Sequence, residues 1–189
     1  MNLNGFILAG GKSTRMGRDK ALLDWHGRTL LEHMIALLSS AVDRVQVVGR
    51  DHLPDRVPGR GPLSGIATAL QATDADANLL VAVDLPLLTE NFLKSLRSRL
   101  EISKHLLVAC KIGSDFPLCL GVRQSLLPEI QNRITRGDLS IKGFIEACPA
   151  EIISEAELVK NGVNLEIFKN MNTPEEYKSA WSSSVPDVK

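Results

Sequence analysis

The sequence predicts an α/β fold built on a mostly parallel sheet. Short and almost wholly apolar runs occur at Phe6–Leu8, Val45–Val48 and Leu79–Val83, and helical patterns separate them. Strands that are apolar along their whole length are typical of a parallel sheet covered by helices on both faces. The chain has 189 residues, of which 44% are hydrophobic and 23% charged, as expected for one globular domain. We therefore predict a single domain over residues 1–181 and a disordered tail over residues 182–189.

The first half of the chain alternates regularly between strand and helix. The first strand stops at Ala9-Gly10-Gly11, where glycines allow backbone angles that other residues resist. A helix is predicted over Thr29–Leu38, because its apolar residues recur at three- and four-residue spacing behind a Thr29 cap. After the second strand, prolines and glycines between Pro54 and Pro62 indicate a rigid loop. Ser64 is then predicted to cap a helix of small residues that ends at Leu70, before the third strand.

The second half is less regular, but its patterns still alternate. The predicted elements are a helix over Glu90–Leu100, strands over Leu106–Ala109 and Pro117–Val122, helices over Arg123–Ile134 and Ser140–Ala147, a strand over Ala150–Ile153 and a helix over Pro174–Trp181. The last helix has proline in its first turn, which is a favoured position. No repeat and no long linker divides the chain.

Charge and cysteine content narrow the possible partners and location. The formal net charge is +0, so no overall field attracts nucleic acid or an anionic membrane, and we predict neither as a partner. Cys110, Cys119 and Cys148 are odd in number and widely spaced, which argues against a disulfide framework and a zinc site. Residues 1–5 contain no basic segment, and Asp84 interrupts the longest apolar run. We predict a cytoplasmic protein.

The segment from Leu8 to Lys20 is predicted to bind a nucleoside triphosphate. It follows the first strand directly, where open α/β sheets place their ligands. Its glycines let backbone N–H groups approach a phosphate chain, and four cations accompany them: Lys12, Arg15, Arg18 and Lys20. The alternative is a surface loop whose charges are incidental.

Two familiar phosphate-binding patterns do not fit this segment. The P-loop requires lysine directly after its second glycine, but counting from Gly5 places Gly11 after Gly10. The dinucleotide pattern G-x-G-x-x-G also fails, because Gly10 and Gly11 are adjacent and position 14 is Thr. An ATPase of the P-loop type and a dehydrogenase are therefore disfavoured.

Asp84 is the predicted metal ligand. It ends the apolar run of the third strand, so its carboxylate faces the same crevice as the glycine segment. An ionised carboxylate is costly to bury unless it pairs with a cation, and Mg²⁺ is the cation that accompanies triphosphates. On position alone, an aspartate that only caps the following turn is an equal alternative.

Two further segments are candidates for the site. Asp55 lies in the proline-rich loop, where its carboxylate could accept hydrogen bonds from a ribose hydroxyl or a guanine edge, although a plain turn is an equal alternative. In Asn170-Met171-Asn172, an extended backbone would direct both amides to one face and Met171 to the core. Those amides could steady a metal-bound pyrophosphate, and helix capping by Asn172 or Thr173 is the alternative.

Several segments, spread over nearly the whole chain, match the sequence pattern of a known protein family in their order and spacing. They are Leu8-Ala9-Gly10-Gly11 with Arg15-Met16-Gly17 and Asp19-Lys20, Gly61-Pro62-Leu63-Ser64-Gly65-Ile66, Asp84-Leu85-Pro86, Pro117-Leu118 and Asn170-Met171-Asn172-Thr173-Pro174. Together they resemble the MobA-like family of molybdenum cofactor guanylyltransferases. The resemblance implies a Rossmann-like three-layer sandwich of the nucleotidyltransferase type.

The resemblance also implies roles for individual residues. Leu8, Ala9 and Gly10 would contact the nucleotide, together with Gly11 of the same loop, while Lys20 would contact the phosphates, Asp55 the base or ribose, and Asp84 both the nucleotide and Mg²⁺. Lys20, Asp84 and Arg15 are the predicted catalytic residues. The chain departs from the family pattern at Val48-Gly49, where some relatives have asparagine, and at Phe116, where a polar residue is common.

The activity implied is transfer of GMP from Mg-GTP to the terminal phosphate of molybdopterin-bound molybdenum, with release of pyrophosphate. The predicted partners are GTP, a molybdopterin-type cofactor and molybdoenzyme-maturation proteins. The alternatives are a CTP-dependent cytidylyltransferase or another small-phosphate nucleotidyltransferase of the same fold, and a non-catalytic nucleotide-binding module. The Gly10-Gly11 pair favours the guanylyl branch by resemblance, while the presence of both Lys20 and Asp84 disfavours the silent module.

Overall fold

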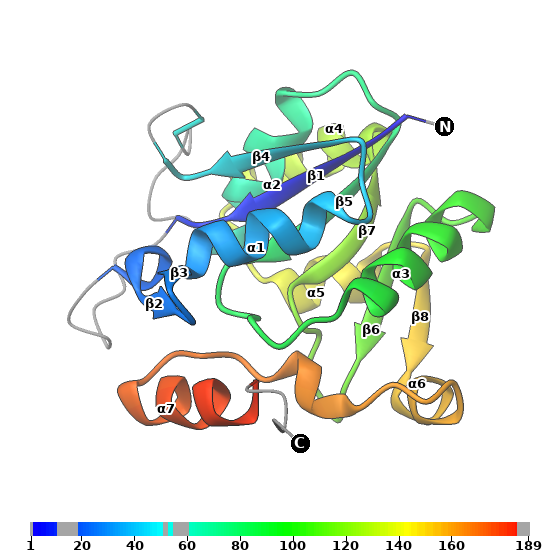
Figure 1. Ribbon diagram of the computed structural model, residues 1–189. Coiled ribbons are helices and arrows are strands. Elements are labelled where there is room, and N and C mark those ends of the chain that lie inside the picture. The colour runs from blue at the N-terminus through cyan, green and yellow to red at the C-terminus, as the bar shows by residue number, and fades with distance from the viewer. Residues whose placement is uncertain (1, 11–18, 51–52, 55–60, 185–189) are drawn as a thin grey trace.

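A six-stranded sheet forms the centre of the protein. The structure is a computed structural model that describes residues 2–10, 19–50, 53–54 and 61–184 (Figure 1). The strands are β1 (Leu3–Leu8), β4 (Arg44–Val48), β5 (Ala77–Ala82), β6 (Leu107–Lys111), β7 (Cys119–Arg123) and β8 (Ala150–Ser154). Their order is β4-β1-β5-β7-β6-β8. Only β7 runs antiparallel to its neighbours β5 and β6, so the predicted mostly parallel sheet is confirmed.

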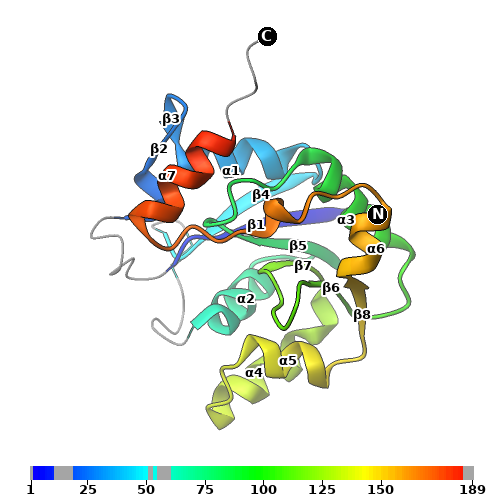
Figure 2. The same cartoon turned by 90° about the horizontal axis from the view of Figure 1, so that it is seen from below.

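Helices cover both faces of the sheet, as Figure 2 shows from below. One face carries α1 (Leu30–Ser39), α3 (Glu90–Ile102), α6 (Glu155–Lys160) and α7 (Pro174–Ser183), and the other carries α2 (Gly61–Gln71), α4 (Leu127–Arg136) and α5 (Ile141–Ala147). A separate cluster of buried apolar side chains fills each interface. The three-layer α/β architecture predicted from the apolar strands is therefore confirmed.

Local signals set several helix ends as predicted. The Thr29 side chain accepts a hydrogen bond from the Glu32 backbone, and Glu32 accepts one in return from the Thr29 N–H at 2.7 Å. The same reciprocal arrangement of Thr173 and Glu176 begins α7. Such capping boxes satisfy backbone donors that have no partner within the helix.

Other predicted boundaries need correction. Helix α2 begins at Gly61, so Ser64 is a buried residue within its first turns and not its cap. The predicted helix over Arg123–Ile134 is divided, because Arg123 ends β7 and a 3₁₀ turn η3 (Gln124–Leu126) precedes α4. Proline near the start of α4 fits that division, since proline needs no backbone donor there. Helix α7 continues to Ser183, two residues past its predicted end at Trp181.

A small hairpin that the sequence did not reveal packs against α1 and α7. It consists of β2 (Asp24–Trp25) and β3 (Arg28–Thr29), and follows a 3₁₀ turn η2 (Lys20–Leu22). Trp25 is only 2% exposed, and its ring packs edge-on against Trp181 of α7. Helix α6 and a 3₁₀ turn η4 (Leu165–Phe168) were also not predicted from the sequence.

The three cysteines are free thiols. Burial raises the pKa of the Cys110 thiol to about 12, so this side chain stays protonated and behaves as a small apolar core residue. Across the parts of the chain that the structure describes, we find no helix with the length and apolar character needed to span a membrane.

Candidate active site

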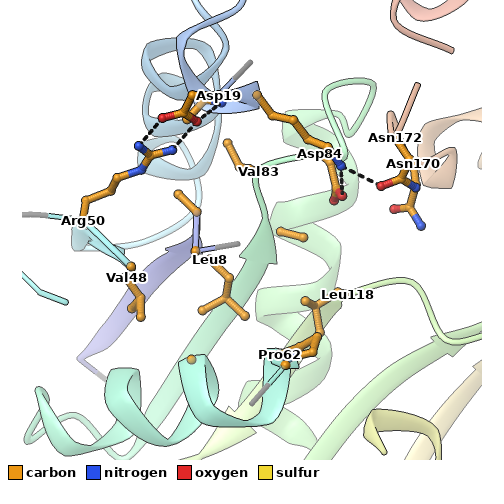
Figure 3. Close-up of a pocket in the computed structure, with 18 residues that line it drawn as sticks. Leu8, Asp19, Val48, Arg50, Pro62, Val83, Asp84, Leu118, Asn170 and Asn172 are labelled. Carbon is orange, nitrogen blue, oxygen red and sulfur yellow. Dashed lines mark hydrogen bonds and ion pairs between the residues drawn. The ribbon is translucent and has the colours of Figure 1, made fainter. Parts of the chain in front are cut away.

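A pocket of about 530 Å³ lies where β1, β4 and β5 end (Figure 3). Its lining residues are Leu8, Ala9, Gly10, Asp19, Lys20, Ala21, Val48, Gly49, Arg50, Gly61, Pro62, Gly65, Ala82, Val83, Asp84, Leu118, Asn170 and Asn172. They come from the carboxyl ends of three parallel strands, the 3₁₀ turn η2, the start of α2, the residue before β7 and the segment before α7. Ligands of open α/β sheets bind at this edge.

Backbone hydrogen bonds continue past the strand ends and hold the floor of the pocket together. The Ala9 N–H donates to the Val48 carbonyl at 2.9 Å, and the Val83 N–H donates to the Leu8 carbonyl at 3.1 Å. On the other side, the Ala82 N–H donates to the Leu118 carbonyl at 2.8 Å. The loops that follow β1, β4 and β5 therefore leave the sheet side by side.

One wall of the pocket, which we call the Asp84 wall, consists of Lys20, Asp84, Asn170 and Asn172. The Lys20 ammonium lies 3.3 Å from Oδ2 of Asp84 and donates a hydrogen bond of 2.6 Å to Oδ1 of Asn172. The side chains of Lys20 and Asp84 are 14% and 22% exposed, so both remain accessible from the pocket. These residues are far apart in sequence, and the fold brings them together.

The segment before α7 is fixed by its central residue. Met171 is fully buried, and its backbone N–H donates to the carbonyl of Asp84 at 2.9 Å. Asn170 and Asn172, on either side, both line the pocket, so the predicted alternation of these three side chains is confirmed. Thr173 caps α7, whereas Asn172 turns its side chain toward Lys20.

The opposite wall, which we call the Arg50 wall, consists of Gly10, Asp19, Gly49 and Arg50. The Arg50 guanidinium donates to both carboxylate oxygens of Asp19, with 2.5 Å between Nη2 and Oδ1. These hydrogen bonds hold the pKa of the Asp19 carboxyl below its usual range, while partial burial opposes the shift. Figure 3 shows the Asp19–Arg50 pair and Asp84 on different sides of the pocket.

Backbone packing places the Arg50 wall. Gly49 has φ of +86°, and a Cβ built on it would lie 2.5 Å from both the Cα and the N of Gly10. Only glycine allows this backbone angle together with so close an approach. The asparagine that some relatives have near this position therefore does not fit at Gly49, because a side chain there would collide with the Gly10 backbone.

The structure brings five of the predicted site residues to one pocket: Leu8, Ala9, Gly10, Lys20 and Asp84. Gly11, Arg15 and Asp55 lie outside the described residues, so their predicted roles stay predictions. Sequence reasoning missed the pairing of Asp19 with Arg50. No pattern could have revealed it, because 31 positions separate the two residues and their contact depends on how β4 leaves the sheet.

The chemistry of the pocket suits an anionic ligand accompanied by a metal. Lys20 supplies a cation, Asp84 an oxygen ligand for a metal, and the eleven-residue helix α2 starts at the pocket with the positive end of its dipole. The described lining residues include no histidine or cysteine. This arrangement favours charge neutralisation and alignment of phosphates over acid–base or nucleophilic catalysis.

Fold and pocket together define a nucleotidyltransferase of the open α/β type. Residues 5–152 match the MobA-like NTP transferase domain, so the chain belongs to that family. It is 36% identical over 183 residues to the molybdenum cofactor guanylyltransferase of Xanthomonas euvesicatoria pv. vesicatoria, covering 92% of this chain and 91% of that protein.

Two further comparisons agree with this assignment. A protein of Carboxydothermus hydrogenoformans named "Probable molybdenum cofactor guanylyltransferase" is 33% identical over 186 residues, covering 94% of each chain. The crystal structure of molybdopterin-guanine dinucleotide biosynthesis protein A from Archaeoglobus fulgidus superposes with a TM-score of 0.82 at 23% identity. That superposition covers 95% of this chain and 97% of the other, and it confirms the fold.

Proposed function

We propose that this protein transfers GMP from Mg-GTP to the terminal phosphate of molybdopterin-bound molybdenum and releases pyrophosphate. The observation that carries the proposal is the convergence of Lys20, Asp84 and Asn172 on one wall of the strand-end pocket. The names of the relatives are the reason for proposing a guanine nucleotide and a molybdenum cofactor as the substrates. The proposal includes a cytoplasmic location and delivery of the product to molybdoenzyme-maturation proteins.

The donor set at the Asp84 wall fits Mg²⁺. Magnesium prefers oxygen ligands and usually retains water and substrate phosphates, so one or two protein carboxylates suffice. Asp84 offers a carboxylate, and Asn170 and Asn172 offer amide oxygens or support for bound water. Among the described residues, there is no cluster of three or more His, Cys, Asp or Glu side chains that could hold a metal ion.

Asp84 would be the residue that holds Mg²⁺, and Lys20 is its present partner. The Lys20 ammonium, 3.3 Å from Oδ2 of Asp84, provides a positive charge that balances this carboxylate. Mg²⁺ would take over that charge balance and would polarise the phosphate oxygens. The Lys20 ammonium would then be available to the phosphates, with Asn172 supporting it from the other side.

The reaction needs little acid–base machinery. An oxygen of the acceptor phosphate forms a bond to the α-phosphorus of GTP, and the bond from that phosphorus to the bridging oxygen of pyrophosphate breaks. The attacking oxygen is already negative, so no base has to remove a proton. Lys20 and the N-terminus of α2 stabilise the charge that develops on the phosphates, and Leu8, Ala9 and Gly10 form the pocket beside the nucleotide. Arg15 and Gly11 complete the proposed contacts.

Calorimetric titration with the four nucleoside triphosphates in Mg²⁺ tests the nucleotide that we propose. GTP should bind at least about tenfold more tightly than CTP, because each polar group left unpaired by the wrong base costs about 1–3 kcal/mol. Preference for CTP would move the protein to the cytidylyl branch. Failure to bind any triphosphate would reject the proposal.

Asp55 provides a sharper test of base recognition. If its carboxylate accepts from the N1 and exocyclic amine donors of guanine, Asp55→Ala should narrow the difference in affinity between GTP and ATP. Asp74→Ala is the matched control, because Asp74 is an exposed aspartate at the other end of the sheet from the pocket. An unchanged GTP preference in Asp55→Ala would remove this residue from base recognition.

A further inference from the structure

Arg50 lies on the pocket wall yet directs its guanidinium toward a neighbouring carboxylate. Nη1 and Nη2 donate to the two oxygens of Asp19, which is the paired contact that a planar guanidinium makes with a carboxylate. The side chains of Arg50 and Asp19 are 31% and 34% exposed, so the pair lies at the rim of the pocket and not in bulk solvent. Its position connects the end of β4 to the residues that follow the glycine-rich segment.

The backbone around Arg50 is held on both sides. The Gly49 N–H donates to the Leu53 carbonyl at 2.8 Å, and the Leu53 N–H donates to the Arg50 carbonyl at 2.9 Å. Gly49 also packs directly against Gly10. Arg50 therefore projects from a fixed point of the sheet edge.

Asp19 links Arg50 to the turn that carries Lys20. Its Oδ1 accepts a hydrogen bond of 3.1 Å from the Ala21 N–H, so Asp19 is the N-cap of η2, whose first residue is Lys20. The turn closes when the Leu23 N–H donates to the Lys20 carbonyl at 3.1 Å, and the Ala21 side chain is fully buried. With Asp19 and Ala21 both fixed, the Cα of Lys20 is held at the pocket wall, from which its ammonium reaches Asp84 and Asn172.

We propose that Arg50 is a positioning residue for the transfer reaction, acting through Asp19 to hold η2 so that the Lys20 ammonium faces the phosphates. The inference deepens the proposed function and depends on it for its kinetic part. The competing possibility is that Arg50 binds the nucleotide directly. The bidentate contact favours the positioning role, because moving the guanidinium to a ligand would break two charge-assisted hydrogen bonds and leave Asp19 to cap η2 alone.

A double-mutant cycle on the full-length protein separates these possibilities. The variants are Arg50→Gln, Asp19→Asn and the double variant, with Arg50→Lys as a conservative substitution that keeps the charge but loses the fork. Arg44→Gln is the matched control, because Arg44 is an exposed arginine at the start of β4, whereas Arg50 follows the end of that strand. For each protein, kcat for nucleotidyl transfer, the dissociation constant for Mg-GTP and the thermal midpoint Tm are measured.

We expect each single variant to lower kcat about tenfold and the GTP dissociation constant to change by less than about threefold. The kcat of the double variant should be no lower than that of the poorer single variant, since the two substitutions remove the same interaction. Arg50→Lys should recover only part of kcat, and Arg44→Gln should behave as wild type.

Other results would overturn the inference. Weaker GTP binding in Arg50→Gln but not in Asp19→Asn, with additive effects, would make Arg50 a nucleotide-binding residue. If the Arg50 and Asp19 variants all lowered Tm equally and left kcat unchanged at low temperature, the pair would contribute to stability alone. If the wild-type protein transferred no GMP, the proposed function would fail, whereas coupling of the two residues in Tm would still show whether the pair anchors η2.

Discussion

The two walls of the pocket each hold an aspartate beside a cation, but the pairs are built differently. On the Arg50 wall, Arg50 contacts both oxygens of Asp19. On the Asp84 wall, Lys20 approaches a single oxygen of Asp84 at 3.3 Å and makes a shorter contact, 2.6 Å, with Asn172. We infer from this difference that the Asp19 carboxylate has a structural role, whereas the Asp84 carboxylate can exchange its partner.

This contrast follows from the chemistry of the two cations. Arginine fits a carboxylate through two parallel hydrogen bonds and does not lose its charge in proteins. The lysine ammonium is a point charge on a flexible stem, so it can follow an anion that enters the pocket. If the pocket accepts Mg²⁺ and a triphosphate together, as we propose, the second kind of pair suits the reacting end and the first kind suits the place where η2 is anchored.

The largest effect is expected from Asp84→Asn. The substitution keeps the shape of the side chain but removes the charge that would hold Mg²⁺, so kcat should fall about 10³-fold or more while Tm changes little. Asp74→Asn is the matched control, because Asp74 lies before the other end of β5 and lines no described part of the pocket. Near-normal turnover of Asp84→Asn in Mg²⁺ would exclude Asp84 from the mechanism.

Lys20→Ala should have the next largest effect and should distinguish catalysis from binding. If its charge matters most as pyrophosphate departs, kcat should fall about 10²-fold and the affinity for GTP should fall much less. Steady-state kinetics combined with calorimetry would measure both quantities. A loss of GTP affinity with unchanged turnover at saturation would reduce Lys20 to a binding residue.

The parts of the fold that could be predicted are those whose signal is local. β1, β4 and β5 are continuous apolar runs between breakers, and Thr29 and Thr173 carry capping boxes that can be recognised in the sequence. The β2–β3 hairpin could not be predicted, because strands of two residues have no periodicity and depend on the burial of Trp25 against distant aromatic rings. The start of α2 was misplaced for a related reason, since Ser64 is buried by packing and not used as a cap.

The candidate site also has features that could be predicted from the sequence and features that could not. Asp84 could be predicted because an ionisable residue that ends an apolar run requires a cation. The Asn172–Lys20 contact and the Asp19–Arg50 pair could not, because each joins residues that only the tertiary fold brings together. The sequence therefore indicated Asp84 on one wall, and it gave no sign of the Asp19–Arg50 pair on the other.

Gly49→Ala tests the anchoring wall through its backbone. Gly27 is the matched control: its φ of +85° nearly equals the +86° of Gly49, but a Cβ there meets nothing within 4 Å. Gly27→Ala should cost about 1–2 kcal/mol of unfolding free energy from the left-handed backbone alone. Gly49→Ala should cost about 2 kcal/mol more, because its Cβ would collide with the Gly10 backbone. Equal costs in urea denaturation would contradict the close packing of the two loops.

The smallest expected effect concerns pH and the outer support of the Asp84 wall. His33 contacts the Pro86 carbonyl through Nε2 at 2.9 Å and the Arg28 guanidinium through Nδ1 at 2.8 Å. Arginine only donates hydrogen bonds, so Nδ1 must accept and the proton lies on Nε2, as in the neutral ring. Burial lowers the pKa of His33 below its usual 6.5; the Pro86 carbonyl opposes this shift, while Arg28 and His26 add to it.

The sign of the pH effect follows from that shift. Just below pH 6.5 the unfolded chain binds a proton at His33 that the folded protein does not, so the free energy of unfolding should fall as the pH is lowered through this range. Asp19 also has a lowered pKa, from a usual value of 3.8, so its contribution is lost only in much more acidic solution. Urea denaturation between pH 5 and pH 8 should therefore show a slope that His33→Gln reduces and Asp19→Asn leaves in place. An identical slope in wild type and His33→Gln would show that the Pro86 carbonyl, and with it the loop that carries Asp84, does not depend on the neutral imidazole.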